Sequence, residues 1–125
     1  MTDPLALIIE DDEKLAFIFS EALKSVEFET EIINEGNKAL ARLAEITPAV
    51  VVLDLHLPKV SGQEILQHIQ NDDRLNQTRV MLATADSLLA ETLRDDADLV
   101  LLKPISFTQM RDLAARLRPP DTIMD

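Results

Sequence analysis

The chain has 125 residues and no cysteine, and its 23 acidic against 12 basic side chains give a formal net charge of −11. These features exclude disulfides and thiolate chemistry, and they disfavour direct binding to nucleic acids or anionic membranes, which so acidic a surface repels. No N-terminal stretch is ordered like a signal peptide, and no apolar run nears the ~18 residues of a membrane span, so we expect a cytoplasmic protein.

The N-terminal unit is predicted to be a strand, an acidic turn and a helix. Residues 5–9 are an apolar run of strand length, and four acidic side chains follow at residues 10–13. Apolar side chains then recur over residues 15–26 with the spacing of an amphipathic helix. Asp12 is placed to cap that helix, because aspartate is a preferred residue before a first helical turn.

The central unit contains the most apolar strand of the chain. A mixed strand over residues 30–34 and a helix over residues 39–46 precede it. Residues 49–53 (Ala-Val-Val-Val-Leu) are typical of a strand buried on both faces of a parallel sheet, and Asp54 ends this run. Residues 61–64 (Ser-Gly-Gln-Glu) have the spacing of a capping box, which predicts the start of the next helix.

Two further units complete the pattern. It predicts a strand over residues 79–83, a helix over 87–94, a strand over 98–102 and a last helix over 106–117. Two prolines, at positions 119 and 120, end this helix. We therefore expect one domain over residues 1–118 and a short C-terminal tail over residues 119–125.

Strands and helices thus alternate strictly, which predicts an α/β fold with a parallel sheet and right-handed crossovers. With only two glycines, the chain has neither a dinucleotide-binding G-x-G-x-x-G motif nor a P-loop. We therefore expect the flavodoxin-like, doubly wound fold with strand order 2-1-3-4-5. In that order the first and third strands are neighbours at the switch point.

Charged and hydroxyl side chains follow these strands at their carboxyl ends, where open α/β sheets bind ligands. Glu10 and Asp11 follow the first strand, Asp54 the third, Thr84 the fourth and Lys103 the fifth. Three carboxylates at one edge repel one another, so they are expected to raise a pKa or to bind a cation. A set of oxygen ligands without histidine or cysteine side chains points to Mg²⁺.

The same set suits a phosphoryl group. Mg²⁺, the Thr84 hydroxyl and the Lys103 ammonium would meet its three equatorial oxygens, and the Asp54 carboxylate would be the nucleophile that forms an acyl phosphate. Taken singly, each residue has a simpler interpretation: a turn or cap for Asp54, a helix-start hydroxyl for Thr84 and a surface charge for Lys103. The prediction therefore depends on their joint placement at one edge of the sheet.

The sequence resembles the receiver domain of two-component response regulators over residues 5–117. The motifs that carry the resemblance are Leu7-Ile8-Ile9-Glu10-Asp11-Asp12, Val51-Val52-Leu53-Asp54 with Pro58 and Gly62, Thr84-Ala85, and Lys103-Pro104. The resemblance implies a phosphoacceptor module in which Asp54 takes a phosphoryl group from a phosphohistidine on a sensor histidine kinase or phosphotransfer protein. It also implies a cis peptide between Lys103 and Pro104, which is uncommon enough to check directly.

The resemblance further implies a role for each residue of the site. Asp11, Asp54 and the backbone carbonyl of His56 would bind Mg²⁺ directly, and Glu10 would act through a bound water. The phosphoryl oxygens would be contacted by Thr84 and Lys103.

Two positions depart from the family pattern. Val100 lies in the middle of the fifth strand, where these domains usually carry tyrosine or phenylalanine, and Asp96 replaces the usual glycine before that strand. We therefore expect switching to rely on the loop that carries Thr84 and Asp86. His56 and Asp86 are candidates for tuning the lifetime of the acyl phosphate, although a surface position is the simpler interpretation of the His56 ring.

Two alternative functions stay open from the sequence. A phosphorylation-independent interaction scaffold is one, and Val100 favours it. A Mg²⁺-dependent phosphohydrolase is the other, but such enzymes usually carry a second aspartate where this chain has His56. For this reason we expect a regulator rather than an enzyme, and the sequence leaves open whether it stands alone or is a receiver excised from a longer regulator. Because no output domain follows the last helix of this sequence, we expect its output to be a protein contact. It would signal to a downstream protein through its fourth helix, fifth strand and last helix, and pairing of two copies stays open.

Overall fold

The computed structural model describes residues 3–120, which form five strands and five α-helices. The strands are β1 (Leu5–Ile9), β2 (Glu29–Ile33), β3 (Val50–Asp54), β4 (Arg79–Thr84) and β5 (Leu99–Leu102). The helices are α1 (Glu13–Lys24), α2 (Gly36–Leu43), α3 (Gly62–Asn71), α4 (Ser87–Thr92) and α5 (Phe107–Leu117). Two short 3₁₀ turns, η1 (Asp73–Leu75) and η2 (Arg94–Asp96), precede β4 and β5.

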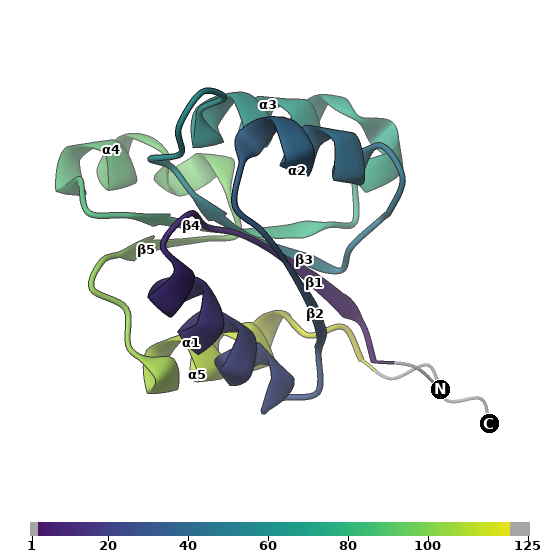
Figure 1. The fold of residues 1–125 in the computed structure, drawn as a ribbon, viewed down its shortest axis with the longest axis vertical. Helices are drawn as coiled ribbons and strands as arrows, with labels where there is room; N and C mark the ends of the chain where they lie inside the picture. Colours follow the sequence, from purple (N-terminus) through teal and green to yellow (C-terminus); the bar gives the residue numbers. More distant parts are fainter. Residues whose placement is uncertain (1–2, 121–125) are drawn as a thin grey trace.

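All strands pair in parallel in one sheet with the order β2-β1-β3-β4-β5, which confirms the predicted fold. Figure 1 shows α2, α3 and α4 over one face of the sheet and α1 and α5 over the other. Because β1 and β3 are neighbours, the loops that follow them leave the sheet side by side at its carboxyl edge. This is the switch point at which the sequence predicts a ligand site.

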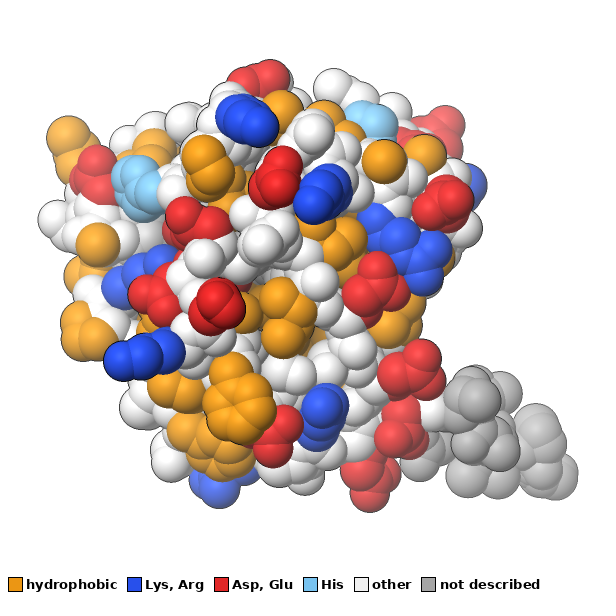
Figure 2. All heavy atoms as spheres, viewed as in Figure 1, with side chains coloured by type: hydrophobic (Ala, Val, Ile, Leu, Met, Phe, Trp, Pro, Cys, Tyr) orange, Lys and Arg blue, Asp and Glu red, His pale blue; other side chains and the backbone are white. Residues whose placement is uncertain are grey.

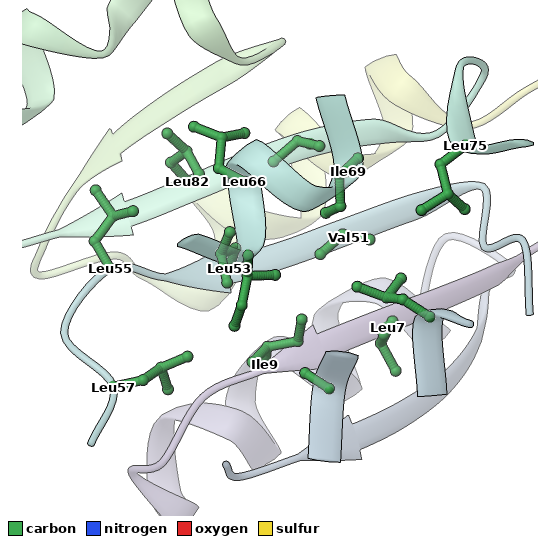
Figure 3. Close-up of a cluster of buried hydrophobic side chains, with 14 of the residues drawn as sticks. Leu7, Ile9, Val51, Leu53, Leu55, Leu57, Leu66, Ile69, Leu75 and Leu82 are labelled. Atoms are coloured by element: carbon green, nitrogen blue, oxygen red, sulfur yellow. The ribbon is translucent and has the colours of Figure 1, made fainter. Parts of the chain in front are cut away.

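Alternate side chains of the central strands fill two apolar cores, as the two-residue period of a strand requires. The core under α2 and α3, drawn in Figure 3, takes from β1 and β3 the side chains of Leu7, Ile9, Val51 and Leu53. The core under α1 and α5 takes the intervening residues Ala6, Ile8, Val50 and Val52. Every residue of β3 is buried, as predicted for a strand covered on both faces.

Capping side chains determine where two of the helices begin. The Asp12 carboxylate accepts the N–H groups of Lys14 and Leu15 at 3.0 and 3.1 Å, which confirms its predicted cap on α1. At α3, the Ser61 hydroxyl accepts the Glu64 N–H and the Glu64 carboxylate accepts the Ser61 N–H, so the predicted capping box is present. Both contacts satisfy N–H groups that a first helical turn leaves without partners.

The fourth helix is shorter than the predicted range of residues 87–94. It has six residues, none of them buried, and at Leu93 the chain passes into η2. Leu93 is the last buried apolar side chain of this segment, and the three charged residues of η2 would give a longer helix no apolar face to pack on the sheet. The second helix also ends at Leu43, before the predicted residue 46, although Ile46 still packs against the core under α2 and α3.

The acidic composition is visible on the surface. Figure 2 shows carboxylates spread over the face drawn there, among basic and apolar side chains. Among residues 3–120, no helix is both long enough and apolar enough to cross a membrane. Within the predicted tail, residues 121–125 lie outside the described residues, and the boundary at residue 118 stays a prediction.

Candidate functional site

Glu10, Asp11 and Asp54 lie together at the carboxyl edge of the sheet. One oxygen atom from each of the three carboxylates lies within 4.8 Å of the other two. Glu10 and Asp54 are buried, with 2% and 3% of their surfaces exposed, whereas Asp11 is exposed. The strand register explains this convergence: Ile9 of β1 pairs with Leu53 of β3, so the residue after each reaches the edge at the same level.

Lys103 brings a positive charge to these carboxylates from the end of β5. Its Nζ donates to Glu10 Oε1 at 3.1 Å and to Asp54 Oδ1 at 3.4 Å. Its backbone N–H donates to the Thr84 carbonyl at 2.7 Å, which ties the residue to the end of β4. Burial lowers the pKa of Lys103, but the Glu10 and Asp54 carboxylates outweigh burial and leave that pKa raised, so the side chain is an ammonium. The Lys103-Pro104 peptide is cis, as predicted.

The site carries more negative than positive charge. Burial, and after it the charge of Asp54, raise the pKa of Glu10 to about 7, although the Asp12 N–H and the Lys103 ammonium act in the opposite direction. Three carboxylates that face one ammonium form a site in which a divalent cation would relieve the repulsion. Mg²⁺ takes carboxylate, carbonyl and water oxygens, so the donors present fit the predicted ion.

The main chain orients the Asp54 side chain. Asp54 Oδ1 accepts the His56 N–H at 3.1 Å. The N–H of Leu55 donates to the Ala83 carbonyl at 3.0 Å, which continues the pairing of β3 with β4 beyond the end of β3. One carboxylate oxygen therefore has a fixed direction, set by the backbone turn on one side and by Lys103 on the other.

The two glycines of the chain allow close packing against the loop that follows Asp54. A Cβ at Gly62 would lie 2.5 Å from the Asp54 carbonyl oxygen, so α3 begins this near to the strand only because that position has no side chain. A Cβ at Gly36, the first residue of α2, would lie 2.6 Å from the Val60 carbonyl oxygen. The loop is thus confined between the first turns of α2 and α3.

Thr84 reaches the same edge, but its hydroxyl is joined to the ring of His56. The residue is fully buried, and its Oγ1 lies 2.9 Å from His56 Nε2 and accepts the Asp86 N–H at 3.0 Å. Within the described residues, no hydrogen bond joins this hydroxyl to the three carboxylates. The sequence predicts both residues near the pocket but not their contact, which depends on the strand register and on the direction of the His56 ring.

Asp86 and Val100, the two other positions considered for switching, have evident structural contacts. The Asp86 carboxylate caps α4 by accepting the N–H groups of Leu88 and Leu89, both at 3.0 Å. Val100 packs against the core under α2 and α3. Because β5 consists of aliphatic residues only, it offers no aromatic ring to pack beside Thr84.

A family model for the response regulator receiver domain matches residues 6–115. The chain belongs to this family. The match confirms the resemblance seen in the sequence and makes the protein a receiver domain of the two-component type, which is a signalling module rather than a classical enzyme.

Individual relatives agree with this assignment. The receiver domain is 32% identical over 114 residues to the transcriptional regulatory protein TrcR of Mycobacterium tuberculosis, covering 90% of this chain and 43% of TrcR, so it spans less than half of that relative. The bacteriophytochrome response regulator RtBRR is 26% identical, with a TM-score of 0.79 over 100% of this chain and 83% of its own. The chemotaxis response regulator CheY4 of Vibrio cholerae shares the fold, with a TM-score of 0.84 at 19% identity over 93% of this chain and 99% of its own.

Proposed function

We propose that this receiver domain accepts a phosphoryl group on Asp54 from a phosphohistidine of a sensor histidine kinase or phosphotransfer protein. The observation that carries the proposal is the environment of Asp54. This carboxylate is buried at the switch point, one of its oxygens lies within 4.8 Å of an oxygen of Glu10 and of Asp11, and it accepts a hydrogen bond from Lys103 at 3.4 Å. A nucleophile, a cation site and a fixed ammonium are thus present together.

In the proposed transfer, an Asp54 carboxylate oxygen attacks phosphorus as the bond between phosphorus and the donor imidazole nitrogen breaks. The electron pair of that bond leaves with the imidazole, which takes a proton from solvent, and Asp54 becomes an acyl phosphate. Lys103 would neutralise one of the equatorial oxygens, and the Thr84 hydroxyl would donate to another. The backbone turn at His56 keeps the attacking carboxylate oriented.

Mg²⁺ would be held by the carboxylates of Asp11 and Asp54 and by the backbone carbonyl of His56, with Glu10 acting through a water. When bound, the ion would supply positive charge to the phosphoryl oxygens. The three carboxylates that face one ammonium support this part of the proposal, because burial and the charge of Asp54 raise the pKa of Glu10 to about 7 and a bound cation would favour its ionised form.

The experiment that tests the proposal is incubation with acetyl phosphate and Mg²⁺, followed by intact mass measurement. We expect a single phosphoryl adduct that is stable in acid and labile in base, and we expect Asp54→Asn to abolish it. Chelation of Mg²⁺ should also prevent the adduct. The matched control is Asp112→Asn, which makes the same chemical change at an exposed position on α5, paired only with Arg111.

The possible outcomes of this experiment distinguish the three functions that the sequence leaves open. An adduct that survives in Asp54→Asn, or that never forms, would contradict the proposal, and its complete absence is what an interaction scaffold predicts. Rapid turnover of a small phosphoester would indicate a phosphohydrolase. Membership of the receiver family favours neither alternative.

We further propose that the output is a contact with a downstream protein through α4, β5 and α5. Leu88 on α4 and Leu102 at the end of β5 support this choice, because 76% and 46% of their surfaces are exposed although both are large and apolar. Direct contact with nucleic acid is not part of the proposal, given the net charge of −11. A cytoplasmic location is part of the proposal, and the lack of cysteine in this chain fits it.

A further inference from the structure

The hydroxyl of Thr84 already has two hydrogen-bond partners. A threonine hydroxyl has one proton to donate and two lone pairs to accept with. One lone pair accepts the Asp86 N–H at 3.0 Å, and the next partner is His56 Nε2 at 2.9 Å. If the ring carries its proton on Nδ1, Nε2 accepts the only proton of the hydroxyl, and a phosphoryl oxygen on Asp54 would have to compete for it.

His56 connects the two halves of the site within one residue. Its backbone N–H donates to Asp54 Oδ1 at 3.1 Å, while its ring reaches the Thr84 hydroxyl at the end of β4. The residue itself is exposed, so its ring can turn into solvent, and the buried Thr84 hydroxyl then keeps the Asp86 N–H as a partner. A change at Asp54 can therefore reach Thr84 through a side chain that is free to move.

The connection continues to α4. Asp86 donates its backbone N–H to the Thr84 hydroxyl, and its carboxylate caps the helix through Leu88 and Leu89. Among the described residues, the His56 ring is the only side chain that hydrogen-bonds to the Thr84 hydroxyl. Because β5 is aliphatic, it has no aromatic side chain that could control the orientation of Thr84. The His56 ring is the side chain placed to do so.

We propose that His56 is a positioning residue: its ring holds the Thr84 hydroxyl in the unphosphorylated domain and releases it when Asp54 carries a phosphoryl group. This inference rests on the proposed function of Asp54. It predicts that loss of the ring nitrogen destabilises the unphosphorylated arrangement and shifts the population towards the phosphorylated one.

The first test measures affinity for beryllofluoride with Mg²⁺, a stable mimic of the phosphoryl group, by calorimetry. We expect His56→Phe, which keeps a ring but removes the acceptor, to tighten binding by about two- to twelvefold, the range of one hydrogen bond in proteins. His56→Gln, whose amide can replace Nε2, should stay near the wild-type affinity. The control is His68→Phe, the same change at an exposed position on α3.

A double-mutant cycle with Thr84→Val shows whether the ring acts through the hydroxyl. In the Thr84→Val background, His56→Phe should change the affinity by less than about twofold, because the bond it removes no longer exists. If His56→Phe keeps its full effect there, the ring acts on access to the pocket and the inference is wrong. An unchanged or weaker affinity of His56→Phe in the otherwise wild-type domain also overturns it.

Nitrogen chemical shifts of the His56 ring give a second test that needs no substitution. We expect the unphosphorylated domain to show Nδ1 protonated and Nε2 as the acceptor, and beryllofluoride to remove the Nε2 signature of that bond. A proton on Nε2 in the unphosphorylated domain contradicts the inference. If the wild type binds no beryllofluoride, the proposed function fails and the inference fails with it, whereas binding without any effect of His56 overturns the inference alone.

Discussion

The two sides of the site differ in how firmly the fold holds them. Asp54 ends β3, whose five residues are all buried, and leads into α3, a ten-residue helix with a capping box and four buried residues. Thr84 leads instead into α4, a six-residue helix with no buried residue, and the neighbouring β5 has one buried residue in four. Segments with few buried apolar contacts open at low free energy. Asp54, the proposed phosphoacceptor, is thus held firmly, whereas the residues proposed to respond to it lie on the side with fewer buried contacts.

The largest effect is expected on the free energy of unfolding when one leucine from each side is replaced by alanine. Leu53→Ala removes a fully buried side chain next to Asp54 and should lower the free energy of unfolding by about 2–5 kcal/mol. Leu88→Ala, on the exposed face of α4, should change it by less than about 0.5 kcal/mol. Urea unfolding followed by circular dichroism measures both. Similar losses from the two variants would show that the two sides of the site do not differ in stability.

The pH dependence of stability tests the buried charge of Glu10, which lies on the Asp54 side of the site. The Glu10 pKa is raised from 4.5 to about 7, by burial first and by Asp54 second. When the pKa of a carboxyl is higher in the folded state than in the unfolded state, its stabilising effect is fully present below the unfolded-state pKa. This stability is lost as the pH rises through the folded-state pKa. In metal-free protein, ionisation of Glu10 should therefore lower the free energy of unfolding by at most about 3 kcal/mol by pH 8. The loss should occur between about pH 4.5 and 7.

Glu10→Gln should remove this pH-dependent loss, so the measurement is the difference between wild type and variant across the pH range, in chelator. Saturating Mg²⁺ should also reduce the loss in the wild type, because a bound cation favours the ionised carboxylate. Glu45→Gln, on an exposed side chain, is the control and should leave the wild-type profile unchanged. A wild type that gains stability over Glu10→Gln as the pH rises from 5 to 7 would contradict the prediction.

The smallest effects are expected from removing the side-chain caps of two helices, α3 and α4. Ser61→Ala removes one half of the capping box on α3 and should lower the global free energy of unfolding by about 1 kcal/mol. Asp86→Ala removes the cap of α4, but its loss should appear as faster amide exchange of Leu88 and Leu89 with little global change. Equal global losses would show that α4 unfolds only with the whole domain.

Most of the fold could be predicted because the sequence carries strong local signals. The apolar, β-branched run of β3 and the capping residues Asp12 and Ser61 each act through their own neighbours, so a pattern in the chain is enough to find them. The edge at which Glu10 and Asp54 meet follows once the strand order is known. These parts needed no knowledge of side-chain positions.

The remaining features depend on tertiary contacts that a one-dimensional pattern does not contain. The end of α4 is set by where Leu93 reaches the sheet, which the spacing of leucines does not reveal. The bond between His56 and Thr84 joins residues 28 positions apart, and it depends on the direction of a ring. For this reason, His56 looked like an ordinary surface residue in the sequence although its ring contacts the site.

The confinement of the loop after Asp54 between Gly36 and Gly62 has a practical consequence for making this domain into a sensor. A dye on Leu55 or Val60 would meet the first turn of α3 or α2 and disturb the loop that follows Asp54. The α4 side has room for such a label. Because the chain contains no cysteine, Leu88→Cys would accept one thiol-reactive fluorophore at a single defined position, next to the cap that follows Thr84.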